Sequence, residues 1–194
     1  MDRICVYCGS STGTRDAYAE DAARFGRTLA ARDLGLVYGG GDVGLMGVVA
    51  DAALDAGGDV WGIIPDALAE HEMANERVTH LEVVDSMHTR KQRMAELADG
   101  FVALPGGFGT LEELLEILTW AQLGFHRNPV GVLNVEGYFD PLVDFFDHQT
   151  AEGFVSETHR EMVVVADDAA DLLDRFEAYE PPAIKEFLTD PEQT

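Results

Sequence analysis

Apolar residues along the chain fall into short, nearly continuous runs separated by longer stretches in which they recur every three or four positions. The runs are typical of strands covered on both faces, and the longer stretches of amphipathic helices. The predicted strands are Ile4–Cys8, Leu36–Tyr38, Val60–Ile64, Leu81–Val84, Phe101–Leu104, Val130–Leu133 and Met162–Val165. The predicted helices are Asp16–Arg32, Leu45–Ala56, Thr89–Ala98, Thr110–Leu123, Pro141–Glu152 and Ala169–Phe176. This alternation predicts an α/β fold, a doubly wound parallel sheet with helices on both faces.

The 194 residues contain no repeat, no low-complexity tract and no linker that would split them. We therefore expect one domain over residues 1–180 and a tail, residues 181–194, that can fray. No apolar run approaches the roughly 20 residues that span a bilayer. Met1 is followed within a few residues by a predicted strand, so we expect no signal peptide, no anchor and a cytoplasmic location.

The balance of charge is strongly acidic. Asp and Glu number 36 against 13 Lys and Arg, which gives a formal net charge of −23. Such a surface repels nucleic acid and anionic membranes, so neither is expected as a partner. The acids are spread along the chain rather than gathered in a tail, which suggests adaptation to high salt, where screening shortens the Debye length to about 3 Å at 1 M.

Cys5 and Cys8 form a C-x-x-C motif, which in other contexts serves redox or metal chemistry. Here both fall in a predicted strand, where positions three apart point to opposite faces. We interpret them as buried small hydrophobes. The histidines have no metal-ligand spacing, so no metal site is expected.

Three predicted strands end in loops of glycine or small polar residues: Gly9-Ser10-Ser11, Gly39-Gly40-Gly41 and Pro105–Thr110. Ligands of doubly wound folds bind at this carboxyl edge of the sheet, so the three loops predict a site. The third loop can bring backbone N–H groups to a phosphate at the start of the following helix. The competing interpretation is a capping box, with Thr110 as N-cap and Glu113 at N3, but a cap alone does not require the preceding glycines.

The second loop also fits the dinucleotide pattern Gly39-x-Gly41-x-x-Gly44. By itself this match is weak. Close packing of the helix on the sheet explains Gly44 and Gly47 equally well.

Two further segments carry candidate chemistry. Glu112 and Glu113 are adjacent on a predicted helix, about 100° apart, so only one can face a ligand. The other is expected to be solvated or to compensate the helix dipole. The segment 86–93 is the densest basic cluster in the chain, and cations at a helix start oppose the dipole. A bound anionic substrate would offset that cost.

The motifs resemble those of the LOG (LONELY GUY) family. Pro105–Glu113 matches P-G-G-x-G-T-x-x-E, and Met87–Lys91 matches M-H-x-R-K. The segments 8–11, 39–47 and 118–124 fit as well. The resemblance implies a Rossmann-like homodimer, with no dissociable redox cofactor, that hydrolyses the N-glycosidic bond of a cytokinin or adenosine 5′-monophosphate.

The resemblance also implies residue roles. Arg90 and Glu113 would form the catalytic pair. Substrate contacts would come from Glu72, Lys91, Gly107, Phe108, Gly109, Thr110 and Thr119, and we add Gly9, Ser10 and Gly41 from the other two loops. A carboxylate such as Glu113 would stabilise the oxocarbenium character that develops on the ribose.

Two alternatives stay open. Relatives such as molybdenum-cofactor carriers hold a phosphorylated ligand without cutting it, and the second loop would suit a dinucleotide oxidoreductase. Members of the family have also been labelled lysine decarboxylases. Such an enzyme needs a Schiff-base lysine for pyridoxal phosphate and usually a larger chain.

Overall fold

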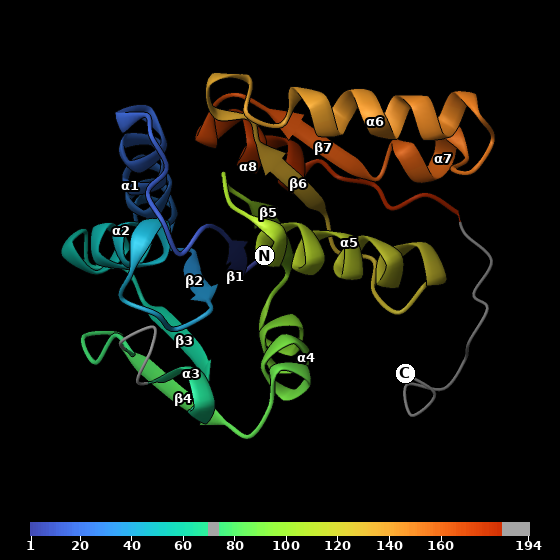
Figure 1. Ribbon diagram of the computed structural model, residues 1–194. Coiled ribbons are helices and arrows are strands. Elements are labelled where there is room, and N and C mark those ends of the chain that lie inside the picture. The colour runs from blue at the N-terminus through green and yellow to red at the C-terminus, as the bar shows by residue number, and fades with distance from the viewer. Residues whose placement is uncertain (70–73, 184–194) are drawn as a thin grey trace.

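The computed structural model describes residues 1–69 and 74–183. Seven parallel strands form one sheet in the order β4-β3-β2-β1-β5-β6-β7 (Figure 1). The strands are β1 (Arg3–Tyr7), β2 (Gly35–Tyr38), β3 (Val60–Pro65), β4 (His80–Val84), β5 (Gly100–Ala103), β6 (Val130–Leu133) and β7 (Val163–Ala166). The chain winds outward from β1 in both directions, so the predicted doubly wound α/β fold is confirmed.

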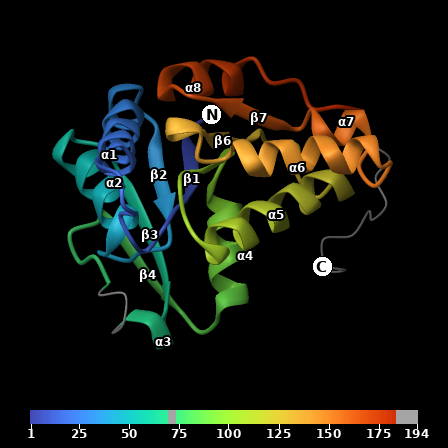
Figure 2. The ribbon, with the colours of Figure 1, turned by 45° about the horizontal axis from the view of Figure 1, so that its top comes forward.

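Helices cover both faces of the sheet (Figure 2). The longer ones are α1 (Asp16–Ala31), α2 (Gly44–Asp55), α4 (Met87–Leu97), α5 (Phe108–Leu123), α6 (Asp140–Ala151) and α8 (Ala169–Glu177). The shorter ones are α3 (Asp66–Ala69), α7 (Glu157–Arg160) and the 3₁₀ turn η1 (Val135–Gly137). Helices α1, α2 and α8 lie over one face, and α4 and α5 over the other. Within the described ranges, no helix is long and apolar enough to span a membrane.

Alternate residues of β1 enter two separate cores. Ile4 and Val6 pack beneath α1, α2 and α8, whereas Cys5 and Tyr7 pack on the side of α4 and α5. All four side chains are buried, because helices cover both faces of a parallel sheet. Cys8, just past the end of β1, belongs to the first core and Cys5 to the second, so the two thiols lie on opposite faces as predicted.

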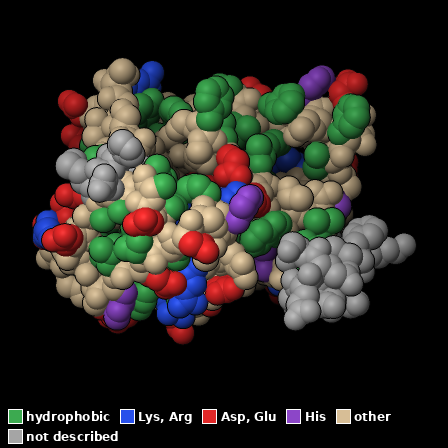
Figure 3. All heavy atoms as spheres, turned by 60° about the horizontal axis from the view of Figure 1, so that its bottom comes forward, with side chains coloured by type: hydrophobic (Ala, Val, Ile, Leu, Met, Phe, Trp, Pro, Cys, Tyr) green, Lys and Arg blue, Asp and Glu red, His purple; other side chains and the backbone are tan. Residues whose placement is uncertain are grey.

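Strand β4 lies at one end of the sheet and is poorly covered. Leu81 and Val83 point to the same face, and Val83 is 54% exposed. On the face that Figure 3 shows, acidic side chains are scattered rather than gathered into one patch.

The predicted elements all occur, and the differences lie at their ends. Helices α4 and α5 each begin two residues earlier than predicted, at Met87 and Phe108. The short elements α3, α7 and η1 were not predicted, since segments of three or four residues show no helical period. Most of the predicted tail, from residue 184, lies outside the described part of the chain.

Candidate active site

The loops that follow β1, β2 and β5 meet where the winding of the sheet reverses, between β1 and β5. The Gly9 amide donates to the Pro105 carbonyl at 3.0 Å, and the Leu45 amide donates to the Gly9 carbonyl at 2.9 Å. Gly44 has a φ of +59°, and a Cβ there would lie 2.2 Å from the carbonyl carbon of Ser10. Direct backbone contacts therefore hold the three glycine-rich strand ends together, at the edge where ligands of such folds bind.

Gly106 lets the loop after β5 fold onto the start of α5. A Cβ on Gly106 would lie 2.1 Å from Oγ1 of Thr110 and 2.8 Å from the Gly9 amide nitrogen. By contrast, a Cβ on Gly107 or Gly109 would meet no atom of the described residues within 4 Å. The first glycine is thus required by packing, whereas the other two leave an open approach to the helix start.

The capping-box interpretation of Thr110 is wrong. Gly107 is the N-cap of α5, with no side-chain cap hydrogen bond, and Thr110 is the third helical residue, 3% exposed. The first intrahelical bond runs from the Leu111 amide to the Gly107 carbonyl, 3.2 Å. The amides of Phe108, Gly109 and Thr110 therefore precede the hydrogen-bonded ladder, and such groups, with the helix dipole, attract anions.

Arg90 is buried beneath the loop after β2, with 5% of its surface exposed. Its Nη2 donates to the Gly39 carbonyl at 3.1 Å, and its Nη1 lies 3.7 Å from the sulfur of Met87. The buried Nε has no hydrogen-bond partner within the described residues. A buried guanidinium nitrogen that no described residue satisfies is costly, which is typical of a group that binds an anionic ligand.

Glu113 approaches the same place from α5. Burial raises the pKa of the Cys8 thiol, the Glu113 carboxylate raises it further, and the Arg90 guanidinium lowers it. The same two charges act on Cys5. The charges of Arg90 and Glu113 therefore both reach the two thiols in and just after β1.

The other cations of α4 are neutralised by the protein itself. Lys91 Nζ lies 2.5 Å from Glu112 and 2.9 Å from Glu116, and Arg93 contacts Glu82 at 3.0 Å. Glu112 thus pairs with Lys91 and does not compensate the dipole of α5, whose first turn holds no acid. A bound anion is therefore not needed to offset Lys91 or Arg93, and Arg90 is the cation of α4 that it would offset.

The remaining predicted residues are not all brought together. Gly9 and Gly41 are buried and Ser10 is exposed in the loops of the site. Thr119 lies on α5, roughly 13 Å along the axis from Thr110, and its hydroxyl donates to the Leu115 carbonyl. Glu72 lies outside the described residues.

Sequence reasoning missed Tyr138, in the turn after β6, whose hydroxyl donates to the Gly106 carbonyl at 2.5 Å. It also missed Ser86, whose side chain caps α4 by accepting from the Thr89 amide. Ser86 carries a recognisable signal, a serine three residues before a threonine at a helix start. Tyr138 carries none, because its partner is 32 residues away.

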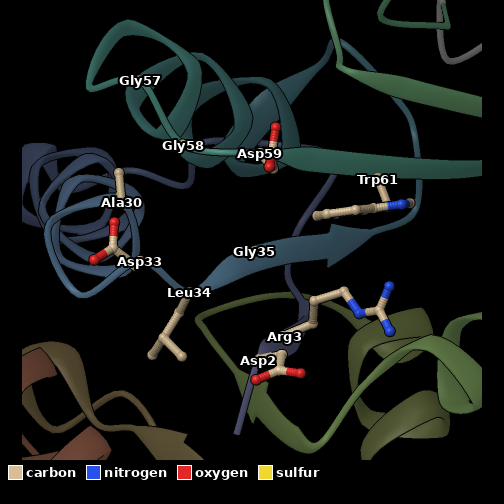
Figure 4. Close-up of a pocket in the computed structure, with 10 residues that line it drawn as sticks. All are labelled: Asp2, Arg3, Ala30, Asp33, Leu34, Gly35, Gly57, Gly58, Asp59 and Trp61. Atoms are coloured by element: carbon tan, nitrogen blue, oxygen red, sulfur yellow. The ribbon is translucent and has the colours of Figure 1, made fainter.

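A cavity of about 370 Å³ lies elsewhere, at the amino ends of β1, β2 and β3 (Figure 4). The Arg3 guanidinium lies 5.3 Å from the centre of the Trp61 ring, and Asp2, Asp33 and Asp59 contribute acidic groups. These carboxylates oppose an anionic ligand, and no group of three metal-ligating side chains occurs in residues 1–69 and 74–183. The cavity is on the opposite edge of the sheet from the candidate site.

Comparison with known proteins gives consistent results. The family described as "Possible lysine decarboxylase" matches residues 46–176. The chain is 51% identical to the Arabidopsis thaliana cytokinin riboside 5′-monophosphate phosphoribohydrolase LOG3, covering 92% of this chain and 83% of that protein. It is 49% identical to the Oryza sativa enzyme LOG, covering 92% and 74%. Among solved structures, the molybdenum cofactor carrier protein of Chlamydomonas reinhardtii shares the fold, with a TM-score of 0.70, 23% identity and coverage of 92% and 99%.

Proposed function

The chain belongs to the LOG family, and from that premise we propose that it is a nucleoside 5′-monophosphate phosphoribohydrolase. The reaction hydrolyses the N-glycosidic bond of AMP or an N6-substituted AMP and releases the free base and ribose 5-phosphate. The relatives that share about half of this sequence carry the name of this activity. The observation that supports it most strongly is the buried Arg90, which binds the glycine loop after β2 and whose Nε has no hydrogen-bond partner among the described residues.

The 5′-phosphate would bind at the start of α5. The amides of Phe108, Gly109 and Thr110 are not used by the helix, and Gly107 and Gly109 leave room for close approach. Phosphate is favoured there by the free N–H groups and by the dipole. Gly9, Ser10 and Gly41 would complete the walls of this site from the neighbouring loops.

Glu113, one turn further along α5, would then lie beside the anomeric carbon. As the bond to the base breaks, positive charge develops on the ribose, and a nearby carboxylate stabilises it. The same carboxylate can take a proton from the water whose oxygen bonds to C1′ as the bond from C1′ to the base breaks. Passing that proton to the departing nitrogen lets the base leave neutral and returns Glu113 to its ionised form. Arg90 would hold Glu113 ionised and fix the substrate through its free Nε.

Lys91, Thr119 and Glu72 are proposed contacts at the other end of the substrate. Lys91 would contact the substrate while it stays paired with Glu112 and Glu116. Thr119 would contact it from the distal part of α5. Glu72 is proposed only from the family motif.

Decarboxylation of lysine is not supported by the lysines of this chain. A Schiff-base lysine must lose its proton readily, which requires a lowered pKa. Partial burial of Lys91 acts in that direction, but the hydrogen bonds to Glu112 and Glu116 outweigh it and raise the pKa above its usual value. The other lysine, Lys185, lies outside the described residues.

The binding-only alternative has weaker support from sequence. The molybdenum cofactor proteins share the fold but are only 20–23% identical to this chain, whereas the phosphoribohydrolases are about 50% identical. The dinucleotide alternative would need an open loop after β2. In the structure the side chain of Arg90 fills the space above Gly39, and Ser10 fills the space above Gly44.

We also propose a homodimer, a cytoplasmic location and adaptation to high salt. The homodimer is proposed from the resemblance to the family. Exposed apolar side chains on α4 and α5, including Phe108 and Leu115, offer a surface for a second copy. The net charge of −23 supports the third.

The proposed activity is tested by incubating the purified protein with nucleoside monophosphates in molar salt and separating the products by chromatography. Free base and ribose 5-phosphate should appear together from AMP or N6-substituted AMP. Adenosine, which lacks the phosphate, should be a poor substrate. Tight binding of AMP without release of base would favour the carrier alternative.

A further inference from the structure

Two consecutive peptide units of the loop after β5 are fixed by groups from outside the loop. The Pro105 carbonyl accepts from the Gly9 amide at 3.0 Å. The next carbonyl, that of Gly106, accepts from the Tyr138 hydroxyl at 2.5 Å. The first contact joins β1 to β5, and the second joins the turn after β6 to the same loop.

The second contact also determines the direction of an amide. A trans peptide unit is planar, and its C=O and N–H point in opposite directions. Fixing the Gly106 carbonyl therefore fixes the N–H of Gly107, the N-cap of α5. Glycine on both sides leaves this peptide unit otherwise free to rotate, because glycine tolerates both signs of φ. The hydroxyl of Tyr138 selects one orientation.

Tyr138 is itself held firmly. Its ring makes edge-to-face contacts with Tyr18 at 5.5 Å and with Phe139 at 5.0 Å. The turn that carries it is fixed by the buried Asn134, whose Oδ1 accepts from the Phe139 amide at 2.7 Å. Within that turn Glu136 adopts a φ of +52°, which is unusual for a residue with a side chain. Backbone strain of this kind is retained where the surroundings impose it, often near functional sites.

We propose that Tyr138 is a positioning residue for the 5′-phosphate of the substrate. Its hydroxyl holds the Gly106–Gly107 peptide so that the Gly107 amide joins the free amides of Phe108 and Gly109 around the anion. This inference rests on the proposed function. Tyr138 would affect how tightly the phosphate binds, whereas Glu113 would affect how fast the glycosidic bond is cleaved. The two effects are separable because the phosphate and the anomeric carbon lie at different ends of the ribose.

The test is Tyr138→Phe, which removes the hydroxyl and keeps both ring contacts. Inhibition constants of ribose 5-phosphate and of free adenine are measured against AMP hydrolysis. The inhibition constant of ribose 5-phosphate and KM for AMP should each rise roughly three- to tenfold, the effect of one lost hydrogen bond. The inhibition constant of adenine should stay the same, and kcat should change by less than about twofold.

The matched control is Tyr18→Phe, which removes the hydroxyl of the adjacent ring. That hydroxyl makes no hydrogen bond to the described residues, so both inhibition constants should equal those of the wild type. If Tyr138→Phe loosened the site in general, it would weaken the binding of ribose 5-phosphate and of adenine equally, and this result would overturn the proposal. Inhibition constants equal to those of the wild type would overturn it as well. If the wild type itself neither cleaves AMP nor binds ribose 5-phosphate, the proposed function fails first, and this inference fails with it.

Discussion

The guanidinium of Arg90 occupies the space that a side chain on Gly39 would need. Nη2 donates to the Gly39 carbonyl at 3.1 Å, and a Cβ on Gly39 would lie 1.8 Å from that nitrogen. The glycine after β2 and the arginine in the first turn of α4 are therefore one structural unit, although they are 51 residues apart.

Gly39→Ala should strongly reduce activity while leaving the fold nearly intact. The new methyl group would displace the far end of a flexible side chain, which can move, but the displaced Arg90 could no longer serve the site. We expect kcat/KM to fall on the order of a hundredfold, with a melting temperature within about 4 °C of the wild type. Steady-state kinetics and thermal unfolding measure the two effects.

A double-mutant cycle with Arg90→Ala provides the control. Once the guanidinium is absent, the added methyl group has nothing to displace, so Gly39→Ala should change kcat/KM by less than about threefold in that background. Additive losses would show that Gly39 acts independently of Arg90.

Glu113→Gln should eliminate hydrolysis and retain nucleotide binding. The amide keeps the size of the side chain but can neither stabilise positive charge nor accept a proton, so kcat should fall about a hundredfold or more. Calorimetric titration with AMP should give a dissociation constant close to that of the wild type. Glu112→Gln, which changes the adjacent acid paired with Lys91, should alter kcat far less. Normal turnover by Glu113→Gln would contradict the assignment.

Gly106→Ala should destabilise the protein, whereas Gly107→Ala should not. A Cβ on Gly106 would lie 2.1 Å from Thr110 Oγ1 and 2.8 Å from the Gly9 amide nitrogen, and no flexible chain end can yield there. We expect a loss of about 2 kcal/mol, or roughly 4–8 °C in melting temperature. Gly107 has open space around it, so thermal unfolding of Gly107→Ala should match the wild type. Equal melting temperatures for the two variants would refute the close packing of the loop.

His126 should make stability depend on pH. Burial lowers the pKa of His126 below its usual value of 6.5, and its hydrogen bond to the Ile117 carbonyl only partly opposes this. The unfolded chain then binds the proton more readily, so stability is lost as pH falls below about 6.5. In His126→Gln the melting temperature should change less between pH 7 and pH 5. His148→Gln, at an exposed histidine, is the control and should keep the wild-type dependence of melting temperature on pH. If the melting temperature of His126→Gln depended on pH as steeply as that of the wild type, a role for His126 would be ruled out.

Salt should stabilise the fold. With a net charge of −23, repulsion among carboxylates opposes the compact state, and it is screened as the Debye length falls from about 10 Å at 0.1 M to about 3 Å at 1 M. The melting temperature should rise by about 5 °C or more over this range. Potassium and sodium chloride should act alike at equal ionic strength. No rise in either salt would remove the proposal of salt adaptation.

The fold was largely predictable because its signals are local. The all-apolar strand at Ile4–Val6 and the periodic helix at Asp16–Ala31 each indicate their type without reference to the rest of the chain. The start of α5 was misplaced because Thr110 and Glu113 imitate a capping box, whereas the true cap, Gly107, has no side chain to recognise.

The site was predictable only as a set of motifs. The burial of Arg90 depends on what packs over it, and the charge of Lys91 is balanced by acids from another helix. The contact between Tyr138 and Gly106 joins two turns that only the order of strands brings together. Such long-range relations leave no pattern in one segment.

The uncovered strand β4 gives the acidic surface a second consequence. An exposed terminal strand with apolar side chains such as Leu81 and Val83 can template pairing with another molecule. At neutral pH and low ionic strength, mutual repulsion keeps neighbouring copies apart. Near the isoelectric point of 4.3 that protection vanishes, and the sheet could then grow from one protein into the next. Carboxylates far from the proposed site would thereby protect the protein against precipitation.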